Sequence, residues 1–129
     1  MIVADSSVWI DNIRQNDTPQ VRILLASDEG ELIAGDVVVL EVLRGVRSER
    51  EARIQEARFR SYSITPMLDP EIAVLAAANF RRLRTLGITI RSSVDMIVAT
   101  FCLAHGHALL HDDRDFDHFE HHLGLKVLR

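Results

Sequence analysis

The chain begins with a short apolar run that ends on an acidic residue, and this run constrains the fold more than any other stretch. Ile2–Ala4 is apolar, and Asp5 and two serines follow it. Its length is typical of a strand buried on both faces rather than of a buried helix. In an open α/β sheet, ligands bind beyond the carboxyl ends of the strands, where Asp5 would lie. Capping of the helix that follows is the alternative role for Asp5.

The rest of the sequence alternates short apolar runs with longer helical patterns, which predicts a parallel sheet covered by helices on both faces. Further strands are expected at residues 31–34, 60–65 and 107–111, with a short edge strand at 126–128. Capping residues and periodic apolar positions predict six helices. They are expected at residues 8–14, from 19 to a stop at Gly30, from 35–36 to 44, from 49 to about 58, from 70 to a stop at Gly87, and from 93 to 105.

Composition limits the class of protein. The 129 residues, 47% of them hydrophobic, suit one domain (1–129) with its own core. No run of eighteen apolar residues is present, so no membrane span is expected. We see no secretory signal at the N-terminus, and the single Cys102 cannot form an intrachain disulfide. A cytoplasmic protein is the expectation.

The net charge of −4 hides a strong asymmetry along the chain. Residues 44–91 carry ten basic and five acidic side chains, whereas the remainder carries five basic and fourteen acidic ones. All of the cations except Lys126 are arginine, whose planar guanidinium suits phosphates and stacked bases. A biased genome would produce the same preference, so RNA binding and codon bias both remain explanations at this point.

Several acidic residues stand where a carboxylate is difficult to explain. Glu41 lies in a helix whose sequence is apolar on every side, and this pattern predicts a buried helix. A buried carboxylate needs a partner, which for Glu41 is either Arg44, one turn on, or a metal ion. Asp95 opens a helix within a Ser-x-x-Asp capping pattern, so it has either a capping role or a ligand role. The loop at 112–115 carries three carboxylates, which is either a solvated acidic loop or a cation site.

Together these acids predict one site. Asp5, Asp113 and Asp115 follow expected strands, Glu41 follows another within a few residues, and right-handed crossovers bring the strand ends to one edge. A cluster of carboxylates selects hard cations such as Mg²⁺ or Mn²⁺ over zinc. Phosphodiester hydrolysis is the chemistry that such a site suits.

Four segments resemble a known family, the PIN-domain ribonucleases, and within it the VapC toxin branch. Residues 2–7 are similar to its hydrophobic-Asp-Thr-Ser opening, and residues 41–45 to its Glu-hydrophobic-Leu-x-Gly element. Residues 91–95 and 110–116 resemble its third and fourth acidic motifs. The four motifs occur in family order over the whole chain.

The resemblance implies a PIN-like α/β/α sandwich with a central, mostly parallel sheet. It also implies a Mg²⁺- or Mn²⁺-dependent endoribonuclease acting on structured RNA, often tRNA or ribosomal RNA. It assigns metal ligation to Asp5, Glu41, Asp95 and Asp113, with Asp115 as an auxiliary ligand and the Ser7 hydroxyl orienting Asp5. Asp112 stands where asparagine is frequent in the family, which leaves open which of the three loop acids touches metal. Ser6 stands where threonine is common.

The resemblance further implies a homodimer held with a small VapB-like antitoxin. An acidic crevice would accept an antitoxin arginine in place of the metal, and the expected dimer patch is the pair of helices at 70–86 and 93–105. The alternative from another class is a catalytically inactive PIN-like module that binds RNA or a partner. A receiver domain is disfavoured because serines, not a second acid, follow Asp5. The spacing of three histidines near the C-terminus would also suit zinc, but the single cysteine lies elsewhere, so exposed histidines on a helix surface are favoured: His118, His121 and His122.

Overall fold

A three-stranded parallel sheet lies at the centre of the structure, a computed structural model that describes all residues 1–129. Strand β1 (Ile2–Ala4) lies between β2 (Leu32–Ile33) and β3 (Ala108–Leu110). Val3 is in register with Ile33 on one side and Leu109 on the other. All three strands run in the same direction, so their carboxyl ends share one edge. The fold class predicted from the sequence is confirmed.

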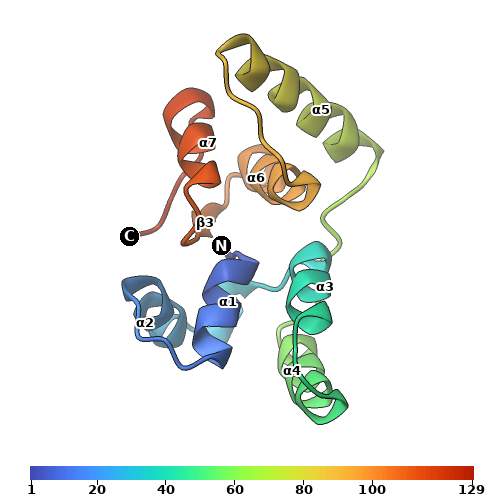
Figure 1. Cartoon of the computed structure of the whole chain (residues 1–129), viewed down its shortest axis with the longest axis vertical. Helices are drawn as coiled ribbons and strands as arrows, with labels where there is room; N and C mark the ends of the chain where they lie inside the picture. Colours follow the sequence, from blue (N-terminus) through green and yellow to red (C-terminus); the bar gives the residue numbers. More distant parts are fainter.

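Seven α-helices surround this sheet (Figure 1). In the view of Figure 1, α1 to α4 occupy the lower half of the molecule and α5 to α7 the upper half. Helix α6 packs against α3, α5, α7 and β3, and therefore joins the two halves. The helices are α1 (Ser6–Ile13), α2 (Pro19–Ala26), α3 (Asp36–Arg44), α4 (Glu49–Ser61), α5 (Pro70–Thr85), α6 (Ser93–His105) and α7 (Asp115–Leu123), with a 3₁₀ turn at Glu29–Glu31.

The helix starts follow from capping residues that the sequence makes visible. The side chains of Thr18, Ser48, Asp69 and Ser92 each accept a hydrogen bond from the backbone N–H three residues on, at 2.8 to 3.2 Å. Each bond satisfies an N–H group that a helix leaves without an internal partner. These four predicted helix starts are confirmed.

Three local predictions are wrong, and a fourth is met only in part. The strand expected at residues 60–65 is absent because α4 continues to Ser61, and only Thr65 forms an isolated parallel bridge, with Gly35. Helix α2 ends at Ala26, before the expected stop at Gly30. Helix α3 is not buried all round: Leu40 is 60% exposed, because α3 packs on α1, α4 and α6 along one side only. Residues 126–128 contribute an isolated parallel bridge between Val127 and Leu109 rather than a full strand.

The core holds the carboxyl end of β1 in place. Trp9 is fully buried, and its Nε1–H donates to the Ala4 carbonyl at 3.1 Å, directly before Asp5. The Trp9 ring meets Phe59 edge to face with centroids 4.9 Å apart, and the Arg58 guanidinium lies over it. A buried tryptophan needs a partner for its N–H, and here that partner is the strand end that carries the first acid.

None of the helices combines the length and the apolarity that a bilayer crossing requires.

Replacing Gly35 with alanine should destabilise the fold. Gly35 precedes α3, and a Cβ there would overlap the sulfur and methyl group of Met67, whose side chain is fully buried. Overpacking of this kind costs about 1 to 3 kcal/mol, measurable by urea denaturation. Gly30→Ala is the matched control, because nothing lies within 4 Å of a Cβ at that position. Equal unfolding midpoints for the two variants would contradict this account.

Candidate active site

Asp5 is held at the end of β1 by its backbone and by Ser7. Its N–H donates to the Leu110 carbonyl at 2.9 Å. Its Oδ2 accepts hydrogen bonds from the Ser7 hydroxyl at 2.7 Å and from the Ser7 N–H at 3.1 Å, so Asp5 also caps α1. Its Oδ1 is buried and has no partner. Burial raises the pKa of Asp5, the Ser7 hydrogen bonds oppose that rise, and the charge of Glu41 adds to it.

Glu41 faces the same edge from α3. The Ser6 hydroxyl donates to Glu41 Oε1 at 2.9 Å, a bond between residues 35 positions apart. The partner considered from the sequence, Arg44, places its Nη2 3.9 Å from Oε2, and its side chain is 71% exposed. An exposed pair at that distance contributes little. Ser6 therefore orients Glu41 more directly than Arg44 does, a role that the sequence did not reveal.

Asp95 shows most clearly that the acids converge. It lies in the first turn of α6, where its N–H donates to the Ser92 hydroxyl, and no hydrogen bond joins its carboxylate to Ser92. The pKa of Asp95 is raised to about 7, first by burial and then by the charges of four other carboxylates. Those four are Asp5, Asp113, Glu41 and Asp115. Four of the five acids expected from the sequence therefore lie within electrostatic reach of the fifth, Asp95.

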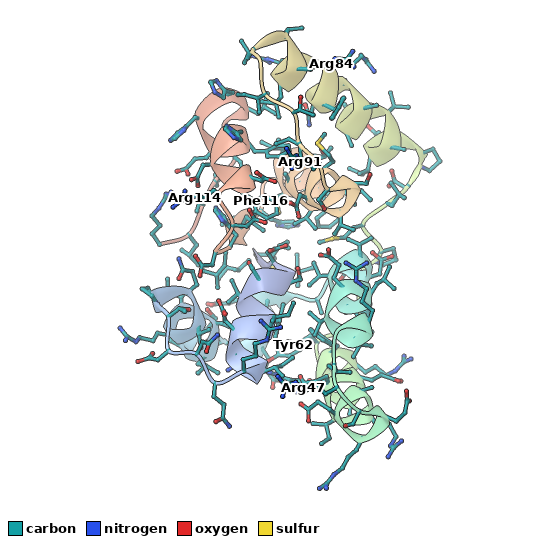
Figure 2. The ribbon with its side chains drawn as sticks, in the orientation of Figure 1. Arg47, Tyr62, Arg84, Arg91, Arg114 and Phe116 are labelled. Atoms are coloured by element: carbon teal, nitrogen blue, oxygen red, sulfur yellow. The ribbon has the colours of Figure 1, made fainter.

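The three acids of the loop after β3 lie in different surroundings. Asp113 and Asp115 are half-buried and act on the pKa of Asp95, whereas Asp112 is exposed and does not. The Asp112 N–H donates to the Ser7 hydroxyl at 3.1 Å, which ties the loop to the residue that holds Asp5. Asp113 Oδ1 accepts the Asp115 N–H at 3.0 Å at the start of α7. Figure 2 shows Arg114 and Phe116 of this region beside β3.

His111, which the sequence gave no reason to single out, lies beneath this loop. It is 8% exposed, and burial lowers its pKa. Its Nδ1 accepts the Asp113 N–H at 3.1 Å. The three histidines considered for zinc lie on α7, where His121 and His122 are exposed. No group of three or more His, Cys, Asp or Glu side chains surrounds one point at metal-ligand distances, and this holds for the histidines of α7 and for the acidic cluster alike.

The acidic cluster nevertheless fits a hard divalent cation. Every candidate ligand is a carboxylate, the donor type that Mg²⁺ and Mn²⁺ prefer. One buried oxygen, Asp5 Oδ1, lacks a partner, and burial together with the neighbouring carboxylates raises the pKa of Asp95 to about 7. The carboxylates lie within electrostatic reach rather than around one coordination point. The nearby Cys102 is no candidate nucleophile, because burial raises the pKa of its thiol to about 12.

The fold and the site together define a class: a small parallel α/β protein with carboxylates gathered at the carboxyl edge of its sheet. Comparison with known proteins gives the family. The profile of the PIN domain matches residues 2–121, and this chain belongs to that family.

Among its relatives are the VapC ribonuclease Mb1587 of Mycobacterium bovis and ribonuclease VapC11 of Mycobacterium tuberculosis. Each is 28% identical over 123 residues, covering 91% of this chain and 90% of the relative. Two solved structures share the fold. FitAcB from Neisseria gonorrhoeae has a TM-score of 0.74 at 18% identity, covering 100% of this chain and 97% of its own. VapBC2 from Rickettsia felis, bound to a DNA fragment from their promoter, has a TM-score of 0.75 at 14% identity, covering 99% and 98%.

Without divalent ions, the protein should lose stability as the pH rises from 4 to 7. Asp95 binds its proton more tightly in the folded state, where its pKa is about 7, than in the unfolded chain, where it is 3.8. In that window the unfolded state has released the proton and the folded state retains it, so rising pH favours unfolding. At about 1.36 kcal/mol per pKa unit, the loss has an upper limit of about 4 kcal/mol.

The comparison that isolates this effect is Asp95→Asn. This variant should be more stable than the wild type near pH 7 and should depend less on pH, measured by urea denaturation in the presence of a chelator. The difference between the two proteins cancels titrating groups outside the acidic cluster, including His107 and His111, whose pKa values burial lowers. Parallel pH profiles would show that the acids do not crowd Asp95.

Proposed function

We propose that this protein is a Mg²⁺- or Mn²⁺-dependent endoribonuclease toxin of the cytoplasm that cleaves structured RNA and is inhibited by a VapB-like antitoxin. Membership of the PIN domain family supports a nuclease site. The similarity to VapC ribonucleases supports RNA as the substrate, with tRNA and ribosomal RNA as the expected classes. The observation that carries the proposal is that carboxylates from three other segments lie close enough to Asp95 of α6 to help raise its pKa to about 7.

The metal ligands would be Asp5, Glu41, Asp95 and Asp113, with Asp115 binding directly or through water. A bound divalent ion supplies a water of lowered pKa and positive charge for the leaving oxygen. The protein's own residues prepare the site for this. The Ser7 hydroxyl and N–H fix one oxygen of Asp5, and the Ser6 hydroxyl fixes one oxygen of Glu41. The second oxygen of each carboxylate would then be the one to bind the ion, with Arg44 Nη2 3.9 Å from that of Glu41.

The arginines provide a means of holding RNA phosphates. Arg91 directly precedes the cap of α6, and Arg114 lies between Asp113 and Asp115; both arginines are exposed. Figure 2 shows Arg91 over α6, Arg114 beside the lower end of α7, and Arg84 at the far end on α5. Arg91 and Arg114 are therefore the arginines expected to contact phosphates next to the scissile bond.

Asp95→Asn should abolish RNA cleavage in a protein that still folds. An asparagine replaces a carboxylate in the first turn of a helix with little loss, but it is a poor ligand for a hard cation. The assay is cleavage of total RNA with Mn²⁺, followed by sequencing of the new 5′ ends. Full activity in a folded Asp95→Asn protein would remove Asp95 from the site.

Two control variants separate the roles. Ser92→Ala removes the hydroxyl that caps α6 and should lower stability by about 1 kcal/mol while cleavage persists. Asp112→Asn removes the exposed acid of the loop after β3 and should also leave cleavage intact. RNA binding without cleavage by the wild type would instead support the alternative, a catalytically inactive PIN-like binding module.

A VapB-like antitoxin is the expected partner, because similar solved structures are of VapBC and FitAB assemblies. A groove of about 630 Å³ lies between α1 and the junction of α3 with α4. Its apolar lining includes Ile10, Ile13, Val42 and Val46. An antitoxin segment in this groove would contact Val42, the residue that follows Glu41 on α3. An arginine in its tail would then compete with the metal for carboxylates.

Replacing the arginines of the antitoxin tail should restore nuclease activity to the purified complex. The neighbouring reading frame is co-expressed, any complex is purified, and each arginine of the C-terminal tail is replaced by alanine, singly and together. Lysine replacements are the control for charge without the planar fork. If no replacement restores cleavage while the complex stays intact, occlusion by arginine is the wrong mechanism.

A homodimer is the expected assembly. On the expected patch, Val74 and Leu75 of α5 are exposed, with Leu68 just before the helix. An apolar groove of about 430 Å³ lies between α5 and α6, lined by residues that include Phe80, Met96 and Ile97. Exposed apolar side chains gathered in this way favour association with a second apolar surface.

A further inference from the structure

The buried imidazole of His111 lies beneath the acidic loop, and the carboxylate site does not account for it. β3 ends at Leu110, so His111 is the residue that joins the sheet to the loop. Its ring packs against Phe116 with centroids 5.0 Å apart, and the residue is 8% exposed. A polar ring in such surroundings is unfavourable unless its nitrogens are used.

The two ring nitrogens have different surroundings. Nδ1 accepts the Asp113 N–H at 3.1 Å. Nε2 is buried and has no hydrogen-bond partner, and the nearest acid, Asp117, places Oδ1 4.0 Å away. A ring nitrogen that accepts a hydrogen bond carries no proton, so the neutral ring carries its proton on Nε2. The only hydrogen bond of the ring is therefore the one between Nδ1 and the Asp113 N–H.

The bond from Asp113 begins a chain of contacts that reaches the candidate ligands. Asp113 Oδ1 accepts the Asp115 N–H at 3.0 Å, and the Asp113 carbonyl accepts the Phe116 N–H at 3.2 Å. The preceding amide, that of Asp112, is tied to Ser7. Two successive loop amides are thus anchored to side chains at the carboxyl edge of the sheet, one to Ser7 and one to His111.

We propose that His111 is a positioning residue for the metal site. By accepting the Asp113 N–H, it holds Asp113, and through it Asp115, in the orientation that faces Asp95. It thereby raises the affinity of the site for a divalent cation, while touching neither the cation nor the substrate. This inference rests on the proposed metal site. The competing explanation is that His111 only fills space between β3 and Phe116.

Three substitutions separate these explanations. His111→Asn places an amide group where Nδ1 lies and can accept the Asp113 N–H. His111→Leu fills similar space with no acceptor. His111→Gln stays polar but reaches the Nε2 position, and so serves if the leucine variant does not fold. Gln55→Leu on α4 is the matched control, because Gln55 is also a buried polar side chain with one unpaired atom.

The experiment is Mn²⁺ titration by calorimetry on the full chain, together with the ¹⁵N–¹H resonance of Asp113 and urea denaturation. His111→Leu and His111→Gln should lower Mn²⁺ affinity by about tenfold or more, as loss of a group that orients a ligand does, and should shift the Asp113 amide. His111→Asn should stay within about threefold of the wild type. Gln55→Leu should leave Mn²⁺ affinity unchanged.

The outcomes are distinguishable. Wild-type affinity in a folded His111→Leu or His111→Gln variant would overturn the proposal, and so would an equal loss in His111→Asn. A wild-type protein that binds no Mn²⁺ would overturn the proposed metal site, and the role of His111 with it. The Mn²⁺ titration of the wild-type protein is enough to detect that outcome.

Discussion

The arrangement of the molecule depends on the pairing of β1 with a parallel strand on each side. This pairing brings the end of β1, with Asp5, to the same edge as the loop after β3, and the Asp5 N–H to Leu110 carbonyl bond fixes that junction. β2 leads through Gly35 into α3, which brings Glu41 to the same edge. Because the strands are so short, the helices and the buried Trp9 supply most of the apolar contact that holds them.

Converging strand ends concentrate negative charge in a partly buried place, and the structure offsets only part of it. Hydroxyl and backbone donors from Ser6 and Ser7 stabilise one oxygen each on Glu41 and Asp5. Asp95 has no such donor, and its pKa rises to about 7. The folded protein at neutral pH therefore carries a repulsion that a proton or a cation relieves. At the proposed metal site, such a repulsion is stability given up for function, as proteins commonly do.

Much of this could be predicted from the sequence, because the signals are local. Capping residues marked four helix starts, and short apolar runs marked the three paired strands. The strand expected at 60–65 failed because the alternation of Tyr62 and Ile64 has another cause: Tyr62 ends α4 and packs on Trp9 with centroids 5.6 Å apart. The bond from Ser6 to Glu41 spans 35 residues, and the burial of His111 depends on α7 packing. Neither contact produces a local pattern in the sequence, so neither could be predicted from it.

The most direct test of the carboxylate site is whether binding of a divalent cation releases a proton. Mn²⁺ is titrated into the wild-type protein by calorimetry at pH 6.5, in two buffers of different ionisation enthalpy. Since Asp95 is largely protonated at that pH, a cation that binds all the acids must displace its proton. The account predicts saturable binding with release of about half a proton or more per ion. Binding without proton release, or no binding, would contradict it.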